Sequence, residues 1–400
     1  MAHVLAVDQY WWDWANLLVR WLHVVAAIAW IGASFYFIAL DNHLRPPEDE
    51  RDAGKGVGGE AWEVHGGGFY HVLKYRVAPQ TLPSPLHWFK WEAYTTWLSG
   101  FALFVVVYYV HASTFLVDPS VADLEGWEAI VISIGGLALA WLVYDGLCRV
   151  LAGKEWLLAA AVSAFVVLSA WAAGELFSGR AAYIQVGAMI GTMMVGNVFF
   201  VIIPAHWELI RAKEAGREPD PAAGLRGKQR SVHNNYFTLP VVFAMLSNHF
   251  PFTYGHAHAW LILVVLMAIG AWTRHYFNLR HVGRNAWWIP LTAALATIAL
   301  AVAIRPDTSS SRAAPGGVVS FARVHAIVRA RCAPCHSLRP TQPGFSSAPL
   351  GVRLDSRNEI EARAGQIKAQ AVDSHAMPLG NATGMTQAER DTLARWLASR

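Results

Sequence analysis

The sequence predicts an all-α protein, in which a polytopic membrane helix bundle is followed by a small α-helical soluble domain. Only 15% of the 400 residues are charged and 54% are hydrophobic, whereas an ordinary soluble domain has about 25% charged residues. The 19 Trp and 12 Tyr residues suit the aromatic belts that form where helices leave a bilayer. The formal net charge of only +4 predicts no nucleic-acid partner, so we interpret the positions of the basic residues as a signal of membrane orientation.

Eight apolar stretches are long enough to cross a hydrocarbon core of about 30 Å as helices. They lie near residues 14–40, 94–113, 129–148, 156–175, 183–204, 235–250, 257–274 and 286–304. The sixth stretch is the weakest, because it is short and is interrupted by Pro240, Asn248 and His249. We therefore expect a membrane domain over residues 1–304 with about eight transmembrane helices.

Basic residues alternate between the loops of this predicted bundle. The first, third, fifth and seventh loops carry the lysines and arginines, whereas the N-terminal tail and the other loops carry only Arg180. Because basic loops stay in the cytoplasm, the alternation places the N-terminus in the periplasm, and eight crossings return the C-terminus there. We expect a multi-pass protein of a bacterial inner membrane, with membrane lipid as a partner.

The first cytoplasmic loop, residues 41–93, is too long to be a simple connection. It contains GGEAWEVHGGGFYHVLKY (58–75) and PSPLHWFKWE (83–92), which are rich in glycine and aromatic residues. This composition predicts an ordered re-entrant or interfacial segment.

The composition changes after the last apolar stretch. Residues 305–317, RPDTSSSRAAPGG, have the composition of a linker. Residues 318–400 then read as a compact domain that opens with a helix over about 318–331. Thr386 and Glu389 have the spacing of a capping box, which predicts a final helix from that point.

Cys332-Ala-Pro-Cys335-His336 has the C-x-x-C-H pattern of c-type haem attachment. The two thiols would add to the haem vinyl groups, and His336 would supply the proximal iron ligand. A zinc site or a redox dithiol is the competing interpretation of this motif. The third cysteine, Cys148, ends an apolar run, and we expect it to be a packing residue.

The second axial ligand of such a haem should be a thioether or another imidazole downstream. Met377, which is followed by Pro378 in the region before the last helix, is our choice. Met385 and His375 are its rivals. A methionine ligand raises the reduction potential, which suits an electron acceptor.

His23 is an ionisable residue inside the first apolar stretch, with Trp30 seven positions later on the same helix face. A buried neutral histidine can ligate the iron of a haem b, and it can equally bond to a backbone carbonyl. Arg20, three positions earlier, would offset an anionic group such as a propionate or a substrate, or would snorkel to the surface. An additional haem b on His23 is therefore a speculative prediction.

Polar residues gather at the predicted cytoplasmic ends of the helices, notably in HNNYFTLP (233–240) and TRHYFN (273–278). Such groups can bind an anionic heterocycle, or they can anchor helices at the membrane interface. The catalytic residues stay unknown from sequence. The candidates are His65, His233, Arg274 and His275.

Several separated segments, in the same order, resemble the bacterial membrane-bound urate oxidase (urate hydroxylase) family. They are RWLHVVAAIAWIGASFYFIALDNHL, GGEAWEVHGGGFYHVLKY, HWFKWEAYTTWLSG, NVFFVIIP, HNNYFTLPVVFAMLSNHFP and MPLGNATGMTQAERDTLARWL. The resemblance covers essentially the whole chain and implies a C-terminal cytochrome c domain over residues 318–400 with one covalent haem c. It also implies oxidation of urate to 5-hydroxyisourate in purine catabolism, with electrons passing through the cytochrome to a respiratory-chain acceptor.

Two other functions fit the same features: a quinol–cytochrome oxidoreductase, and a non-enzymatic membrane-anchored cytochrome c that only carries electrons. The polar helix ends argue against the second, because a plain anchor needs only one apolar helix. The side on which urate binds also stays open, although the polar helix ends favour the cytoplasmic side. A cytoplasmic site would need a cofactor within the membrane, because one tunnelling step across about 30 Å of hydrocarbon is too slow. A site near the periplasmic face would let urate reduce haem c directly.

Overall fold

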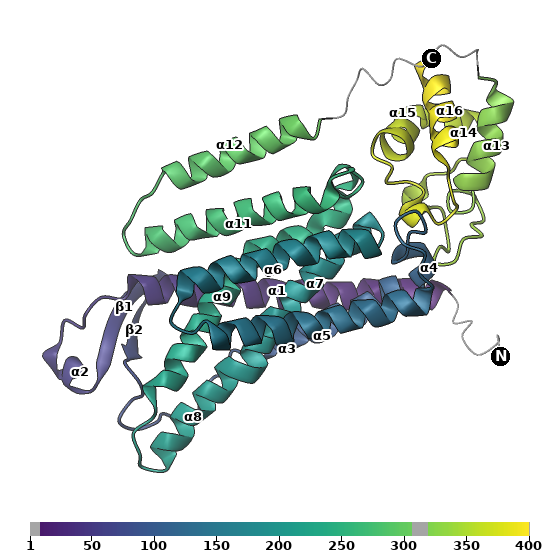
Figure 1. The fold of residues 1–400 in the computed structure, drawn as a ribbon. Coiled ribbons are helices and arrows are strands. Elements are labelled where there is room, and N and C mark those ends of the chain that lie inside the picture. The colour runs from purple at the N-terminus through teal and green to yellow at the C-terminus, as the bar shows by residue number, and fades with distance from the viewer. Residues whose placement is uncertain (1–8, 306–318, 400) are drawn as a thin grey trace.

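The computed structural model describes residues 9–305 and 319–399. The chain forms a long bundle of helices and a compact helical domain that sits against one end of the bundle (Figure 1). We call this end, which carries α4 (Ala112–Phe115) and α10 (Pro251–Tyr254), the docked end. The opposite end, which carries α8 (Ile203–Glu214), is the far end. The predicted all-α class is confirmed.

Every predicted apolar stretch lies on a helix of the bundle. These helices are α1 (Gln9–His43), α3 (Trp91–Phe104) with the π-helical η1 (Val105–Tyr109), α5 (Gly126–Val150), α6 (Glu155–Leu176), α7 (Gly179–Gly196) with the π-helical η2 (Asn197–Ile202), α9 (Pro221–Leu246), α11 (Ala259–His281) and α12 (Trp288–Ala303). Within residues 9–305 and 319–399, five helical segments are long and apolar enough to cross a membrane, namely Tyr10–His43, Gly126–Val150, Glu155–Leu176, Gly179–Glu214 and Ala259–His281. The count of eight crossings stays a prediction.

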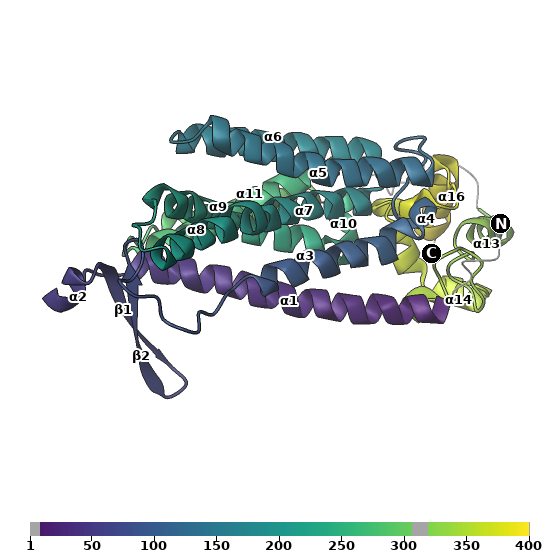
Figure 2. The same ribbon diagram turned by 90° about the horizontal axis from the view of Figure 1, so that it is seen from below.

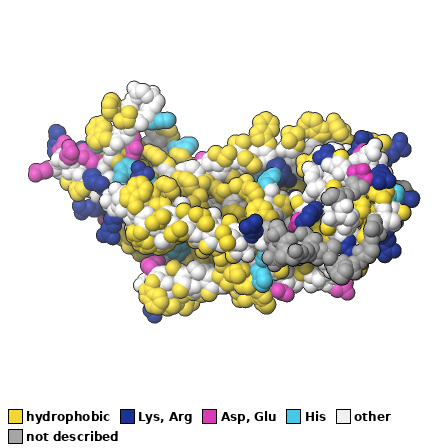
Figure 3. Space-filling view, turned by 90° about the horizontal axis from the view of Figure 1, so that it is seen from above, with side chains coloured by type: hydrophobic (Ala, Val, Ile, Leu, Met, Phe, Trp, Pro, Cys, Tyr) yellow, Lys and Arg dark blue, Asp and Glu magenta, His cyan; other side chains and the backbone are white. Residues whose placement is uncertain are grey.

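The surface of the bundle agrees with a membrane environment. Apolar side chains dominate the middle of the molecule, and most charged side chains gather toward its two ends (Figure 3). On α1, Trp21 and Ile28 are both 67% exposed, although each would be buried in a protein surrounded only by water. Contiguous apolar surface of this extent needs lipid or another apolar partner.

The prediction that Pro240 interrupts the sixth apolar stretch is wrong, because the helix continues through this residue. One continuous helix, α9, runs from Pro221 to Leu246 and includes Pro240. Its neighbour α11 packs closely at Gly270, where an added Cβ would lie 3.2 Å from the Cβ of Leu239. This packing holds α9 helical although a proline removes one backbone hydrogen bond. The helix does end at Leu246, before the short 3₁₀ turn Ser247–His249.

The long loop 41–93 contains a short helix, α2 (Glu50–Gly54), and an antiparallel hairpin of β1 (Val57–His65) and β2 (Gly68–Tyr75). The hairpin projects away from the bundle (Figure 2). The expected re-entrant segment is therefore corrected to a projecting hairpin. Its turn is Gly66-Gly67, with φ of 57° and 81°, and two positive φ angles are what a tight two-residue hairpin turn requires.

The C-terminal domain is built from short helices that follow one another closely. They are α13 (Phe321–Arg331), η4 (Pro349–Gly351), α14 (Arg357–Ala362), α15 (Ala364–Ile367), η5 (Lys368–Asp373), η6 (Leu379–Asn381) and α16 (Gln387–Ala398). Buried Val324 and Val328 of α13 share one apolar core with Leu393 and Trp396 of α16. The domain therefore has a core of its own.

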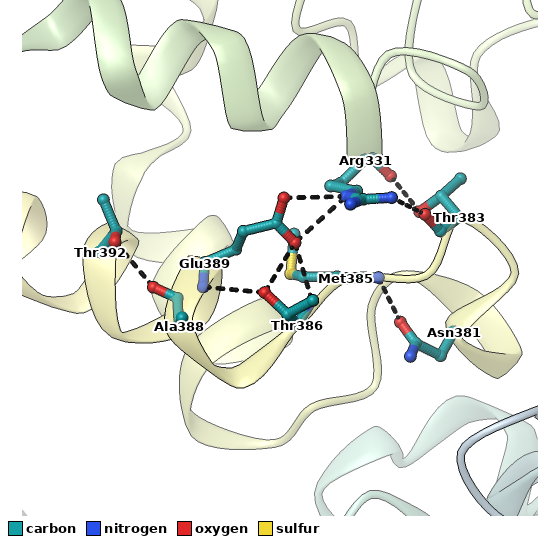
Figure 4. A network of polar contacts seen from close by, with 8 residues as sticks. All are labelled: Arg331, Asn381, Thr383, Met385, Thr386, Ala388, Glu389 and Thr392. Atoms are coloured by element: carbon teal, nitrogen blue, oxygen red, sulfur yellow. Dashed lines mark hydrogen bonds and ion pairs between the residues drawn. The ribbon is translucent and has the colours of Figure 1, made fainter.

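Polar contacts tie α13 to α16 at the edge of this core (Figure 4). Thr386 accepts a hydrogen bond from the backbone N–H of Glu389, whose carboxylate accepts one from the N–H of Thr386. The predicted capping box is thus confirmed. Arg331 of α13 donates to Glu389 at 3.0 Å and also bonds to the carbonyl of Thr383.

Candidate functional site

The Cys332–His336 motif forms a tight turn directly after α13. The backbone N–H of Cys332 donates to Val328 at 2.8 Å, and that of His336 donates to Cys332 at 2.8 Å. The Nδ1 of His336 lies 3.0 Å from the carbonyl oxygen of Val352. Because a carbonyl can only accept, Nδ1 carries the proton, and Nε2 is left as the nitrogen that can bind a metal.

Both thiols of this motif are partly buried. Burial raises the pKa of Cys332 to about 12 and that of Cys335 to about 11, whereas a redox dithiol needs a lowered pKa. In the described parts of the chain, no three His, Cys, Asp or Glu side chains converge as a metal site requires. The raised pKa values argue against a redox dithiol, and thioether attachment of a haem stays a prediction.

Met377 belongs to the same apolar core as Cys332, and it is only partly buried there. Its backbone is fixed on both sides, because Arg390 donates to its carbonyl at 2.8 Å and its N–H donates to Gln370 at 2.9 Å. The rival Met385 is 4% exposed and extends toward Thr386 at the α16 N-terminus (Figure 4). The residues present thus fit a haem iron held by His336 and Met377, which stays a prediction.

The loop that follows the motif docks on the bundle. The side-chain amide of Gln342 donates to the hydroxyl of Thr114 at 3.1 Å, and the ring of Phe345 lies 5.7 Å from that of Phe115. Gly344 between them has a φ of +92°, and a Cβ there would come within 2.9 Å of Phe115. Only glycine allows this approach, which brings the C-terminal domain against α4.

The loop around Met377 docks on the same end of the bundle. A Cβ on Gly380 would lie 2.9 Å from the carbonyl oxygen of Val117, and a Cβ on Gly255 would lie 2.0 Å from the carbonyl oxygen of Ser374. Both glycines thus permit backbone-to-backbone contact between the two domains. These two contacts hold the loop around Met377 against the docked end.

His23 packs between α1 and α3. Its Nδ1 lies 3.0 Å from the carbonyl of Thr96 and 3.3 Å from the hydroxyl of Ser99. The ring covers Gly100, where a Cβ would lie only 2.8 Å from the ring. The carbonyl-bonded alternative accounts for this histidine, and haem b ligation by His23 stays a prediction.

His233 belongs to a buried network at the far end. Its Nδ1 lies 2.8 Å from the hydroxyl of Tyr144, which accepts a hydrogen bond from Asn197 at 2.9 Å. Arg230 completes the network by donating to Asn197 at 3.2 Å and to Asp145 at 2.7 Å. Sequence reasoning missed Arg230 and Asn197, although a polar residue such as Asn197 within an apolar stretch was an available signal.

Arg274 lies in a second polar cluster toward the far end. Its Nε donates to Asn235 at 2.9 Å, and Asn278 donates to the same oxygen at 3.0 Å. The guanidinium carbon lies 4.0 Å from the ring centroid of Phe35. One guanidinium nitrogen of Arg274 and the side-chain oxygen of Asn278 are buried without a hydrogen-bond partner among the described residues.

The four sequence candidates do not form a single site. His275 bonds to the hydroxyl of Tyr236 at 2.7 Å, which is a partner that neither His233 nor Arg274 uses. His65 is exposed at the end of β1, next to the turn of the projecting hairpin. Their predicted catalytic roles stay predictions.

The bundle is the part of the chain that can be matched to a known family. Residues 9–305 match the family model described as urate oxidase N-terminal. No curated protein and no solved structure matches the chain. The family match spans every helix of the bundle and the hairpin, and it ends before the C-terminal domain begins. Because it covers well over half of the sequence, the chain belongs to the urate oxidase N-terminal family.

Proposed function

We propose that the protein is a membrane-bound urate oxidase that converts urate to 5-hydroxyisourate and passes the electrons through a covalent haem c to the respiratory chain. The observation that carries this proposal is the docking of the C-x-x-C-H domain onto a bundle of the urate oxidase family. Two loops of that domain, which flank the motif and Met377, make the contacts. An electron acceptor in the C-terminal domain would therefore lie next to the helix bundle that matches the urate oxidase N-terminal family.

The chain's own residues would hold the haem. Cys332 and Cys335 would form the thioether bonds, and Nε2 of His336 and the sulfur of Met377 would bind the iron. The carbonyl of Val352 keeps His336 in the required tautomer. Once bound, this haem supplies a one-electron acceptor.

The proposed reaction balances without oxygen as a reactant. A urate monoanion and one water give 5-hydroxyisourate, one proton and two electrons. The electrons leave one at a time through the haem to an oxidised carrier of the respiratory chain. The protein must therefore bind a planar anion, admit water and provide a base for the released proton.

The orientation that fits this function places the N-terminus and the C-terminal domain in the periplasm of a bacterium. The alternation of basic residues supports it, because the basic loops belong to the far end. Covalent haem attachment outside the cytoplasm supports the same orientation.

Anaerobic visible spectroscopy of membranes that contain the protein tests the proposal. Addition of urate should produce the absorption band of reduced haem c, and a Cys335→Ala variant should lack this band. Full reduction by dithionite without any reduction by urate would contradict the proposal. Reduction by a quinol in that case would favour the quinol–cytochrome oxidoreductase instead.

A further inference from the structure

A cavity of about 300 Å³ lies between the docked end and the C-terminal domain. One wall comes from the start of α7 and the loop before α11, and the other comes from residues 375–381 around Met377. The contacts of Gly255 with Ser374 and of Gly380 with Val117 hold the two walls together. Its volume is at the lower end of the range for small-molecule sites, which suits a compact heterocycle.

Arg180 gives this cavity a positive charge that no carboxylate of the described chain neutralises through an ion pair. Its Nε donates to the side-chain oxygen of Asn248 at 3.0 Å, and its guanidinium lies 5.9 Å from the rings of Tyr108 and Phe115. Arg20 of α1 is exposed, donates to the side-chain oxygen of Asn16 at 2.8 Å and is close enough to repel Arg180. Arg180 is half-buried and is the arginine in the lining of this cavity, so it can attract an anion even though Asp118 and Glu175 also line the cavity.

Other residues that line the cavity supply the groups that oxidation of a planar anion requires. Trp260 and Tyr183 supply aromatic surface, and His256 and Glu175 supply groups that can accept a proton. Burial, together with the charge of neighbouring His258, lowers the pKa of His256. A neutral imidazole at physiological pH is able to act as a base.

We infer that the urate anion binds in this cavity, with its charge directed at Arg180 and with the Met377 loop between it and the haem. This inference rests on the proposed function and gives it a location. Electrons then pass from urate into the C-terminal domain at the docked end, so no cofactor inside the membrane is required. The cytoplasmic location that the sequence favours is thereby replaced.

The competing anion site is the Arg274 cluster. Arg274 lies fifteen residues along α11 from Ala259, which at 1.5 Å per residue places it roughly 20 Å farther from the C-terminal domain. Its guanidinium stacks on Phe35 and bonds to Asn235, and one of its nitrogens has no hydrogen-bond partner among the described residues. Urate bound there would need an intermediate electron carrier.

Equilibrium binding separates the two locations. Full-length haem-loaded protein in detergent, kept anaerobic and reduced with dithionite so that it cannot turn over, would be dialysed against radiolabelled urate. Arg180→Gln should weaken urate binding by roughly tenfold or more, the size expected for a hydrogen bond to a charged group. Arg180→Lys should weaken urate binding less than Arg180→Gln does, because lysine keeps the positive charge. Arg284→Gln, which makes the same charge change at an exposed position of the far end, should bind like the wild type.

A second variant tests the cavity without changing its charge. Gly174 lies in α6 at the cavity wall, and a Cβ there makes only an ordinary contact of 3.6 Å with Trp260. Gly174→Leu should therefore fold, fill part of the cavity and weaken urate binding. A wild-type spectrum of the dithionite-reduced haem in each variant would show that the C-terminal domain is intact.

Wild-type affinity in both Arg180→Gln and Gly174→Leu would overturn the inferred site. Loss of binding in Arg274→Gln alone would move the site to the Arg274 cluster. Loss of haem from Arg180→Gln with unchanged urate affinity would assign the guanidinium to a haem propionate instead. A wild-type protein that neither binds urate nor is reduced by it would overturn the proposed function, and the site with it.

Discussion

Two arginines at opposite ends of the bundle, Arg230 and Arg180, have different partners. At the far end, Arg230 is 5% exposed and forms an ion pair with Asp145 at 2.7 Å. At the docked end, the hydrogen-bond partner of Arg180 among the described residues is the neutral side-chain oxygen of Asn248. A buried charge with a carboxylate partner is already satisfied, whereas a half-buried arginine without one can take an anionic ligand. Arg274 also lacks a carboxylate partner, and one of its guanidinium nitrogens has no hydrogen-bond partner among the described residues. The choice between the Arg180 and Arg274 sites therefore rests on the cavity and on the distance to the C-terminal domain.

The largest effect should come from breaking the satisfied pair. Asp145→Asn leaves Arg230 buried without a counter-charge, which should cost about 3–5 kcal/mol of folding free energy. Denaturant titration in detergent, followed by Trp fluorescence, would measure it. A loss below about 1 kcal/mol would mean that water reaches Arg230, since an exposed pair contributes no more than that.

The next effect concerns the contact of the two domains. Gly255→Val places a side chain where the carbonyl of Ser374 lies, so the Met377 loop must move away from the docked end. Reduction of the haem by urate should slow by roughly a hundredfold, because a misplacement of about 1 Å can have that effect. Stopped-flow spectroscopy would measure the rate, and reduction by dithionite should stay unchanged. An unaltered urate-dependent rate would argue against electron transfer across this contact.

Substitution of Arg180 should change the free energy of unfolding far less than substitution of Asp145. Arg180→Gln removes a charge that has no carboxylate partner, so the free energy of unfolding should change by less than about 1 kcal/mol or increase. The same denaturant titration applies. Destabilisation as large as that of Asp145→Asn would show that the two ends do not differ as described.

The smallest effect should come from the contacts of Glu389 in the C-terminal domain (Figure 4). Burial alone would raise the pKa of Glu389, but hydrogen bonds from Thr386 and Arg331 hold that pKa below its ordinary value of 4.5. A lowered pKa stabilises the fold above pH of about 4.5, and this contribution is lost as pH falls through the folded pKa.

Glu389→Gln should therefore be less stable than the wild type by up to about 1 kcal/mol at pH 7. The difference should shrink below pH of about 4. Thermal unfolding of both proteins over that pH range would measure it. A difference that does not depend on pH would assign the contact to packing instead of charge.

Local features could be predicted from the sequence because each depends on a few neighbouring residues. The apolar stretches, the Thr386–Glu389 capping box and the position of the C-x-x-C-H turn after a helix all follow from short spacings. The hairpin at 57–75 was missed, since its strands contain aromatic and glycine residues without a regular polar alternation. Pro240 was misjudged, because only the close packing of Gly270 shows how α9 stays helical.

The sequence by itself determined the membrane character, the family and the candidate haem ligands. Composition and hydropathy indicate the membrane character, the resemblance of several segments indicates the family, and the C-x-x-C-H motif with the downstream Met377 indicates the haem ligands. The tertiary structure decided which polar groups are satisfied and which are not. Arg180, Gly255 and His375 are remote in sequence, and they meet at one cavity only after the C-terminal domain docks. Charge pairing and cavity shape depend on such long-range contacts, so they could be recognised only in the folded chain.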